Sequence, residues 1–233
     1  MKTKDFFKIN GVSSDEFTNV LVNLPPIPPL AERKYTEYDV GGDEDYTIAD
    51  DAFKDIKYSI EFMTVDIPEY DNSELYKLIA EAKRLEISRL PGYYYKVRRA
   101  TMQAPTSKYD GGKVTYKINF TLAPFKYHSN QNQITVNSGD IVVNSGTRYC
   151  KPIIEIEVNG TAEISVNGAI FEVTTSEYQN LIIDSGRKIT YDKGTGELIY
   201  NATKGEYPML SSGDNEIVAS TGTLKITLNE RSY

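Results

Sequence analysis

The chain has 233 residues and a formal net charge of −7, with one His, one Cys and no Trp. One cysteine cannot form an intramolecular disulfide, one Cys with one His cannot build a Cys/His zinc site, and an acidic chain is poorly suited to wrapping nucleic acid. The charged first residues and the lack of an apolar run of about 18 residues predict a soluble protein, made in a cytoplasm and without membrane insertion. At roughly 100 to 200 residues per domain, we expect two domains.

The first half of the chain is predicted to be mainly β. Residues 55–66 and 113–122 alternate apolar and polar side chains, so each should be a strand with one buried face. Further strands are expected at 33–40 and 93–102. Asn and Gly both tolerate positive φ, so three pairs predict hairpin turns. These pairs are Asn10-Gly11, Asn159-Gly160 and Asn167-Gly168.

A proline-rich segment, Pro25-Pro26-Ile27-Pro28-Pro29, predicts polyproline II conformation. It is either a stiff connector between strands or a ligand for an SH3-like domain. Because Arg33 is misplaced for the usual basic anchor of such ligands, we favour the connector.

Residues 72–86 carry helical periodicity. Their apolar side chains recur at i, i+3, i+4 and i+7, Asp71 with Glu74 can form a capping box, and Pro91-Gly92 prevents continuation. We therefore expect one amphipathic helix of about 14 residues, packed on the sheet of the first domain. Its apolar residues are Leu75, Leu78, Ile79, Ala82 and Leu85.

The composition changes near residue 128. Residues 128–144 lack strong periodicity until Ile141, so we place the boundary near 128–135 and expect domains at 1–130 and 131–233. Beyond the boundary, short strands follow one another without a helix, which predicts a β-sandwich. The expected strands are 152–158, 162–166, 169–174, 180–184, 188–191, 197–201, 215–219 and 223–228.

Charge is separated along the first domain. Residues 32–71 have a net charge of −9, whereas residues 77–126 have +8. Either these segments neutralise each other within one subunit, or the acidic face of one copy meets the basic face of the next in a heterologous contact that closes into a ring. The candidates for a ring lumen or subunit interface are Asp43, Glu44, Asp45, Asp50, Asp51, Arg98 and Arg99.

The sequence offers no convincing catalytic or metal-binding constellation. His128 stands without a Gly-x-Ser-x-Gly nucleophile turn. Ile183-Asp184-Ser185-Gly186 is similar to the active-site turn of aspartic proteases, but it occurs once and would need a homodimer. Residues 41–45 lack calcium-ligand spacing, and Gly194-Thr195-Gly196 precedes no helix. We expect no enzyme, no metal and no cofactor.

Several short motifs follow one another over nearly the whole chain. In the first half they are Asp5-Phe6-Phe7-Lys8-Ile9-Asn10-Gly11, the Gly-Asp loop after residues 33–40, the helix, Pro91-Gly92-Tyr93-Tyr94-Tyr95 and Ala123-Pro124-Phe125-Lys126-Tyr127. In the second half they are Ile182-Ile183-Asp184-Ser185, Gly205-Glu206-Tyr207-Pro208-Met209-Leu210 and Gly213-Asp214-Asn215-Glu216-Ile217. Their order resembles the distal tail protein (Dit) family of long-tailed, siphovirus-type phages and prophages.

This resemblance implies a structural virion protein of the tail tip or baseplate, assembled in the bacterial host cytoplasm. It implies a β-sandwich or barrel-like N-terminal domain with one helix, which builds a homo-hexameric ring, and a galectin-like C-terminal β-sandwich. The ring would join the tail tube protein to the tail-associated tip protein and to receptor-binding proteins, and DNA would pass through it. The family's Gly-Arg-Asp-Gly loop is replaced here by Gly41-Gly42-Asp43-Glu44, and the second domain has no long insertion.

Two interpretations follow for the candidate residues. An acidic lumen would keep DNA phosphates from binding, so part of the acidic stretch is predicted to face the lumen or the neighbouring subunit. The alternative function is a carbohydrate-binding sandwich that recognises host cell-wall glycan, with Tyr178, Tyr191 and Tyr200 as stacking faces. An aspartic protease that needs a dimer is the third and least favoured hypothesis.

Overall fold

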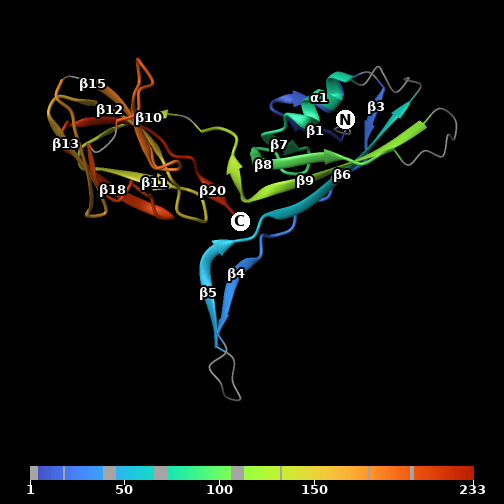
Figure 1. Cartoon of the computed structure of the whole chain (residues 1–233), viewed down its shortest axis with the longest axis horizontal. Coiled ribbons are helices and arrows are strands. Elements are labelled where there is room, and N and C mark those ends of the chain that lie inside the picture. Colours follow the sequence, from blue (N-terminus) through green and yellow to red (C-terminus); the bar gives the residue numbers. More distant parts are fainter. Residues whose placement is uncertain are drawn as a thin grey trace. The chain divides into compact units, whose positions relative to one another are not determined.

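The computed structural model describes residues 5–17, 19–38, 46–65, 73–105, 113–131, 133–177, 179–199 and 202–233. The chain forms two compact units: residues 1–129 together with Tyr233, and residues 130–232 (Figure 1). The predicted Asp71 cap and the loop at 41–45 lie outside the described residues. Within the described part of the chain, no helix has the length and apolar character needed to cross a membrane.

The first unit is built on one large antiparallel sheet with the strand order β2-β1-β7-β8-β9-β6-β3. The predicted strands at 55–66 and 93–102 are present, and the strand predicted at 113–122 continues to His128. The strands are β1 (Phe7–Ile9), β2 (Val12–Ser13), β3 (Val20–Val22), β6 (Ile56–Val65), β7 (Arg84–Ile87), β8 (Tyr93–Met102) and β9 (Lys113–His128), with a 3-10 turn η1 (Ser14–Glu16) after β2. Alternation in β6 buries Ile56, Tyr58, Ile60 and Phe62 on one face.

The helix α1 (Ser73–Ala80) covers that face, and its Leu75 and Ile79 belong to the same buried core (Figure 1). The predicted end at residue 86 is wrong. Oδ1 of Asn10 accepts hydrogen bonds from the backbone N–H groups of Lys83 and Arg84, at 2.9 and 3.1 Å, and Arg84 begins β7. Leu85 still enters the core, but from a strand, so its helical spacing was coincidental.

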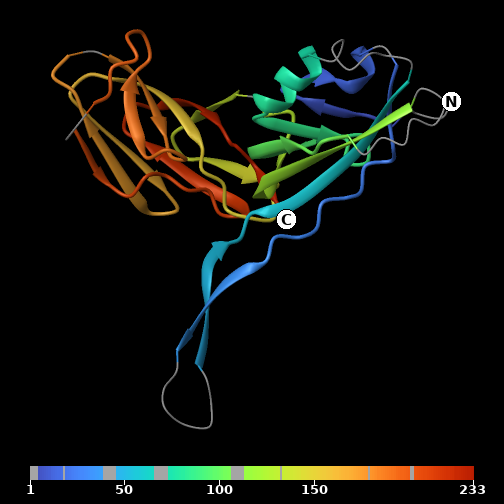
Figure 2. The ribbon, with the colours of Figure 1, turned by 45° about the vertical axis from the view of Figure 1, so that its right-hand side comes forward.

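A β-hairpin arm separates from the large sheet. It consists of β4 (Arg33–Tyr38) and β5 (Tyr46–Phe53), which pair only with each other. Figure 2 shows β5 running directly into β6, so the arm and the sheet share one continuous stretch of chain. The backbone N–H of Lys54 donates to the carbonyl of Glu32 at 2.8 Å and closes the base of the arm.

The proline-rich segment connects β3 with β4, as predicted. Pro25 and Pro28 are buried and the residues between them are exposed, which is the threefold period of polyproline II. The hydroxyl of Tyr58 donates to the carbonyl of Pro26 at 2.7 Å, and burial raises the pKa of Tyr58 well above its ordinary value. The segment is thereby fixed against the first unit.

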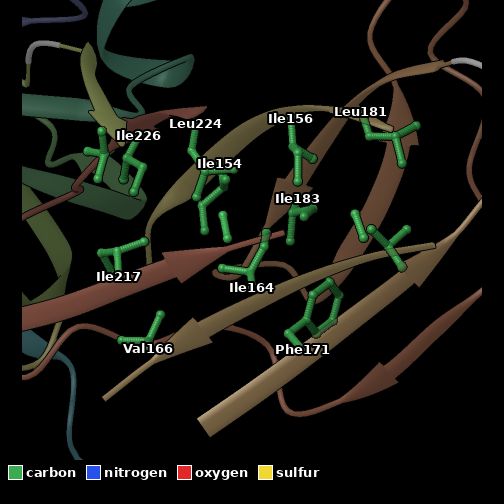
Figure 3. Close-up of a cluster of buried hydrophobic side chains, with 14 of the residues drawn as sticks. Ile154, Ile156, Ile164, Val166, Phe171, Leu181, Ile183, Ile217, Leu224 and Ile226 are labelled. Carbon is green, nitrogen blue, oxygen red and sulfur yellow. The ribbon is translucent and has the colours of Figure 1, made fainter. Parts of the chain in front are cut away.

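The second unit is a sandwich of two five-stranded antiparallel sheets. Sheet I contains β10 (Gln133–Asn137), β19 (Thr223–Thr227), β12 (Ile153–Val158), β15 (Gln179–Asp184) and β16 (Ile189–Asp192), in that order. Sheet II contains β11 (Asp140–Asn144), β18 (Gly213–Ala219), β13 (Thr161–Val166), β14 (Ala169–Thr174) and β17 (Thr203–Gly205). A short last strand, β20 (Arg231–Ser232), follows. Figure 3 shows Ile154, Ile156 and Ile183 of sheet I near Ile164 and Phe171 of sheet II in the common core.

The predictions for this unit need three corrections. Asn159-Gly160 does not close a hairpin, because the strands that it connects, β12 and β13, belong to different sheets. Residues 133–144 lie outside the predicted strands, yet they form β10 and β11, because Val136 and Val142 enter the core and Gly139 turns the chain with φ of 92°. Residues 197–199 form only an isolated bridge, between Tyr191 and Leu198, and the next strand is β17.

Two buried asparagines connect the loops at one end of the sandwich. Nδ2 of Asn215 donates to the carbonyls of Ser211 and Gly213, at 2.9 and 2.8 Å, and its Oδ1 accepts from the backbone of Ser211. Nδ2 of Asn144 lies within hydrogen-bonding distance of the carbonyls of Arg148 and Leu210. This explains the Gly-x-Asn-x-Ile motif: the asparagine satisfies backbone groups that water cannot reach.

Candidate functional site

The face of the large sheet opposite α1 is polar and is called the open face here. By strand register, Arg99, Thr121 and Lys57 form one row across β8, β9 and β6, and Thr101, Asn119 and Ser59 form the next. These side chains line a depression of about 500 Å³, and Nζ of Lys57 donates to Oγ1 of Thr121 at 3.0 Å. The surface offers hydroxyl, amide and cationic groups without an aligned nucleophile and base.

Part of the separated charge is neutralised within the first unit. Nε of Arg98 contacts Oδ1 of Asp55 at 2.9 Å, so this candidate pairs with an acidic residue of its own chain. Lys117 contacts Glu61 at 3.4 Å in the same way. Arg99, by contrast, belongs to the open face.

Of the acidic candidates, Asp50 and Asp51 lie on the arm. Asp43, Glu44 and Asp45 are outside the described residues, and for Asp50 and Asp51 only the backbone is described, in β5. Their role in a lumen or interface therefore stays a prediction.

Sequence reasoning missed a ladder of aromatic rings and cations on β7, β8 and β9. The guanidinium of Arg84 lies 4.0 Å from the ring centroid of Tyr94, which stacks on Tyr127 at 5.4 Å, and Nζ of Lys96 lies 4.0 Å from the Tyr127 centroid. Burial raises the pKa of Tyr94, and the charge of Arg84 opposes this. We call these four residues the aromatic ladder. The sequence signal for the ladder was the two-residue period of Tyr93-Tyr94-Tyr95-Lys96, which places Tyr94 and Lys96 on one face of a strand.

A second aromatic cluster holds the last residue of the chain in the first unit. The rings of Phe53, Phe125 and Tyr233 meet edge to face, with centroids 5.1 to 5.7 Å apart. Because Phe53 ends β5, this cluster fixes the base of the arm where it enters β6.

In the second unit, the carboxylate of Glu155 forms ion pairs with two lysines on the outer face of sheet I. Nζ of Lys193 lies 2.6 Å and Nζ of Lys225 3.4 Å from its Oε1, while Oε2 accepts from Gln133 at 3.3 Å. The carboxylate side chain is only 8% exposed. The hydrogen bond from Lys193 is the main cause that lowers the pKa of Glu155. We call these four residues the Glu155 cluster.

Beside this cluster, the pairing between β12 and β19 of sheet I ends. β12 and β19 pair only as far as Glu155 and Lys225, and beyond that point they border a depression of about 550 Å³. Its rim carries hydroxyl, amide and charged groups over the apolar floor of Ile156 and Leu224. The rim residues are Glu155, Glu157, Asn159, Thr161, Ser220, Thr221, Thr223 and Lys225.

Of the three tyrosines proposed for glycan stacking, Tyr191 alone is described; Tyr178 and Tyr200 lie outside the described residues. Tyr191 is half-buried in β16 and pairs with Ile182, which pairs with Glu155. Paired residues share a face, so Tyr191 and Glu155 lie on the outer face of sheet I, on strands about 10 Å apart.

The residues that the sequence offered as catalytic or phosphate-binding candidates form turn-closing hydrogen bonds or ring contacts. Oδ1 of Asp184 accepts the backbone N–H of Arg187 at 2.9 Å, which closes the turn after β15. The ring of His128 meets that of Tyr93 edge to face at 4.8 Å. Asp192 likewise caps the Gly194–Gly196 hairpin turn through the N–H groups of Gly194 and Thr195. Among the described residues, no group of three or more His, Cys, Asp or Glu side chains is placed to hold a metal ion.

In its described residues, the chain combines an antiparallel sheet covered by the helix α1, a hairpin arm and a β-sandwich. The crystal structure of the SPP1 Dit (gp 19.1) protein, described as a paradigm of the hub adsorption apparatus in phages that infect Gram-positive bacteria, has the same fold. The TM-score is 0.71 over 98% of this chain and 99% of that chain, with 14% sequence identity. No family model and no curated protein matches the sequence. The mainly β fold expected from the resemblance is therefore confirmed.

Proposed function

We propose that this protein is a structural component of a phage tail hub. The observation that carries the proposal is the agreement of fold over nearly the whole of both chains with a hub protein. Motifs in the order expected for such proteins support it independently. In this role the chain is no enzyme and needs no cofactor, and it resides at the distal end of the virion tail.

The proposed mechanism is assembly. Six copies form a ring that joins the tail tube protein to the tail-associated tip protein, and receptor-binding proteins attach around it. The arm of one copy, which belongs to the acidic segment, reaches the basic strands of the next, where Arg99 lies on the open face. Such heterologous contacts close into a ring when the rotation that relates neighbouring copies is an integer fraction of 360°. DNA passes through the lumen, and acidic side chains prevent phosphates from binding there.

The first test is the mass in solution, by light scattering after size exclusion. We expect a species of about six times the 26.2 kDa chain mass at low salt, and smaller species at high salt, because screening weakens acidic-to-basic contacts. Arg99→Glu should weaken assembly, whereas Lys204→Glu, an exposed charge change in the second unit, should not. A protein that stays monomeric even with its tail partners would refute the ring.

The lumen has its own test. Asp43→Lys with Asp45→Lys should impair either ring assembly or DNA ejection from reconstituted virions. Unchanged assembly and ejection would show that these residues face neither the lumen nor a neighbour.

A second candidate function is glycan binding by the second unit. The depression beside β12 is lined by hydroxyl, amide and carboxylate groups that match sugar hydroxyls, and Tyr191 offers a ring on the same outer face. We expect the isolated unit to bind a cell-wall saccharide on a glycan array, and Tyr191→Ala to abolish that binding. A blank array with correctly folded protein would count against this function and leave the hub proposal intact.

A further inference from the structure

An aliphatic stripe runs along one border of the first unit. Leu21, Leu24, Ile27 and Leu30 are 41%, 57%, 51% and 74% exposed. Apart from Tyr233, the exposed large hydrophobic side chains in the described part of this unit all fall between Leu21 and Tyr35. Water-exposed apolar surface is therefore concentrated on one short segment.

The regular spacing of these residues has a conformational cause. Polyproline II has three residues per turn and rises about 3.1 Å per residue, so residues three apart share one face. Pro25 and Pro28 are buried against the protein, and Leu24, Ile27 and Leu30 share a different face, which is exposed to solvent. Together with Leu21 in β3, they form a ridge roughly 28 Å long.

The segment is unsuited to pairing with another strand. Pro25, Pro26, Pro28 and Pro29 have no N–H groups, so a neighbouring strand would find few donors along this border. Contact at the stripe must therefore be made by side chains. That requires a partner surface with apolar faces rather than a free sheet edge.

The exposed area indicates what kind of partner fits. The four side chains expose roughly 400 Å² together, about half of what each partner contributes to a standard stable interface. One such contact is weak for an independent partner. In a closed ring, the contact is repeated around the circle and every copy is held from two sides.

A second copy of this chain offers a surface that complements the stripe. The stripe leads into the arm, whose first strand begins at Arg33. The aromatic ladder presents half-buried Tyr94 and Tyr127 rings together with the exposed cation Lys96. The rings can receive the aliphatic side chains, while the charge of Lys96 is opposite to the net charge of residues 32–53, which follow the stripe in the sequence.

We infer that the stripe packs on the aromatic ladder of a second copy, as the apolar part of the subunit contact. This inference rests on the proposed ring and specifies its interface. The contact is heterologous, so a copy uses its stripe toward one neighbour and its ladder toward the other. Salt weakens the charged part of the interface and leaves the stripe contact in place.

The first experiment compares the assembly of three proteins by sedimentation velocity. Leu24→Ser with Ile27→Ser should raise the concentration at which half the subunits are assembled by at least tenfold. Ile170→Ser, an exposed site of the second unit (57%), should leave it unchanged. Because the substituted residues point to solvent, the variants should keep the wild-type melting temperature. If the wild type assembles and the double variant assembles equally well, the inference is wrong while the ring stands.

The second experiment tests the receiving surface by crosslinking with a short bismaleimide. A mixture of Ile27→Cys and Lys96→Cys proteins should give crosslinked dimers, whereas each protein alone should not. Cys150 is buried and does not interfere. Crosslinking of Ile27→Cys with itself would indicate a stripe-to-stripe contact and overturn the assignment. A wild type that stays monomeric at high concentration, with no crosslink in the mixture, would overturn both the inference and the ring.

Discussion

Cys150 is fully buried between the sheets of the second unit, and burial raises the pKa of its thiol to about 12. The thiolate is the reactive form, so the folded protein should keep this cysteine inert. The unfolded thiol ionises near its ordinary pKa of 9.0. The neutral thiol therefore contributes its full stability below pH 9, and this contribution is lost as the pH rises toward 12.

We expect no reaction of native protein with a thiol reagent at pH 8 and rapid reaction after unfolding. Between pH 9 and 11, the free energy of unfolding should fall more steeply for the wild type than for Cys150→Ala, by up to about 1.4 kcal/mol per pH unit. Parallel pH profiles, measured by urea titration, would contradict this assignment.

The stabilisation by the Glu155 cluster should depend on pH in the opposite direction to that of Cys150. Its carboxylate has a lowered pKa, so the stabilisation is present above the ordinary value of 4.5 and is lost as the pH falls through the folded pKa. At pH 7, Glu155→Gln should lower the free energy of unfolding by about 1 kcal/mol, because it removes both ion pairs. The loss is small because both lysines are half-exposed and are hydrated in the variant. The matched control is Glu157→Gln, an exposed site on the same strand. A difference between Glu155→Gln and wild type that persisted at pH 2 would mean that packing, rather than charge, is responsible.

At the scale of single elements, β17 is positioned by a glycine that no other residue can replace. Gly205 has φ of +88°, and an added Cβ would collide with the carbonyl oxygen of Ile170 in β14. Gly213 has φ of +89°, but open space surrounds its Cβ position. The two sites therefore share the backbone penalty and differ in the collision.

Gly213→Ala should cost about 1 kcal/mol of unfolding free energy, as expected for alanine at positive φ. Gly205→Ala should cost at least about 2 kcal/mol more, since β17 must shift away from β14. Thermal melts of the two variants provide the comparison, and equal costs would show that the strand adjusts freely.

The termini of elements also explain where sequence patterns misled. Leu85 continues the helical spacing of Leu75 and Ile79, yet Asn10 binds the backbone of Lys83 and Arg84 and starts a strand. Asn10 is distant in sequence, so helical periodicity had no means of registering it. β10 was missed because it is short: its five residues alternate polar and apolar side chains but carry only two apolar ones, Ile134 and Val136.

At the scale of the whole molecule, the last residue stabilises the first unit. Tyr233 packs between Phe53 and Phe125, and two edge-to-face contacts contribute about 1 to 2 kcal/mol together. Tyr233→Ala should therefore lower the melting temperature of the first unit and leave that of the second unchanged. Calorimetry of the full chain, with the fragment 130–232 as reference for the second transition, distinguishes the two. A shift of both transitions, or of the second alone, would contradict the assignment.

The sequence by itself determined the β class, the strands with a strictly alternating pattern, the helix start region and the hairpin turns at Asn10-Gly11 and Asn167-Gly168, because these depend on neighbours within a few residues. The order of its short motifs also led to the expectation of this fold. Charge separation was visible as well, since it is a property of composition.

The tertiary structure alone decided which distant side chains meet. It brought Glu155 to Lys193 and Lys225, placed Tyr233 beside Phe53, and turned one side of the proline segment outward to expose the stripe. Such contacts arise from strand register and packing between segments remote in sequence, and local periodicity carries no information about them.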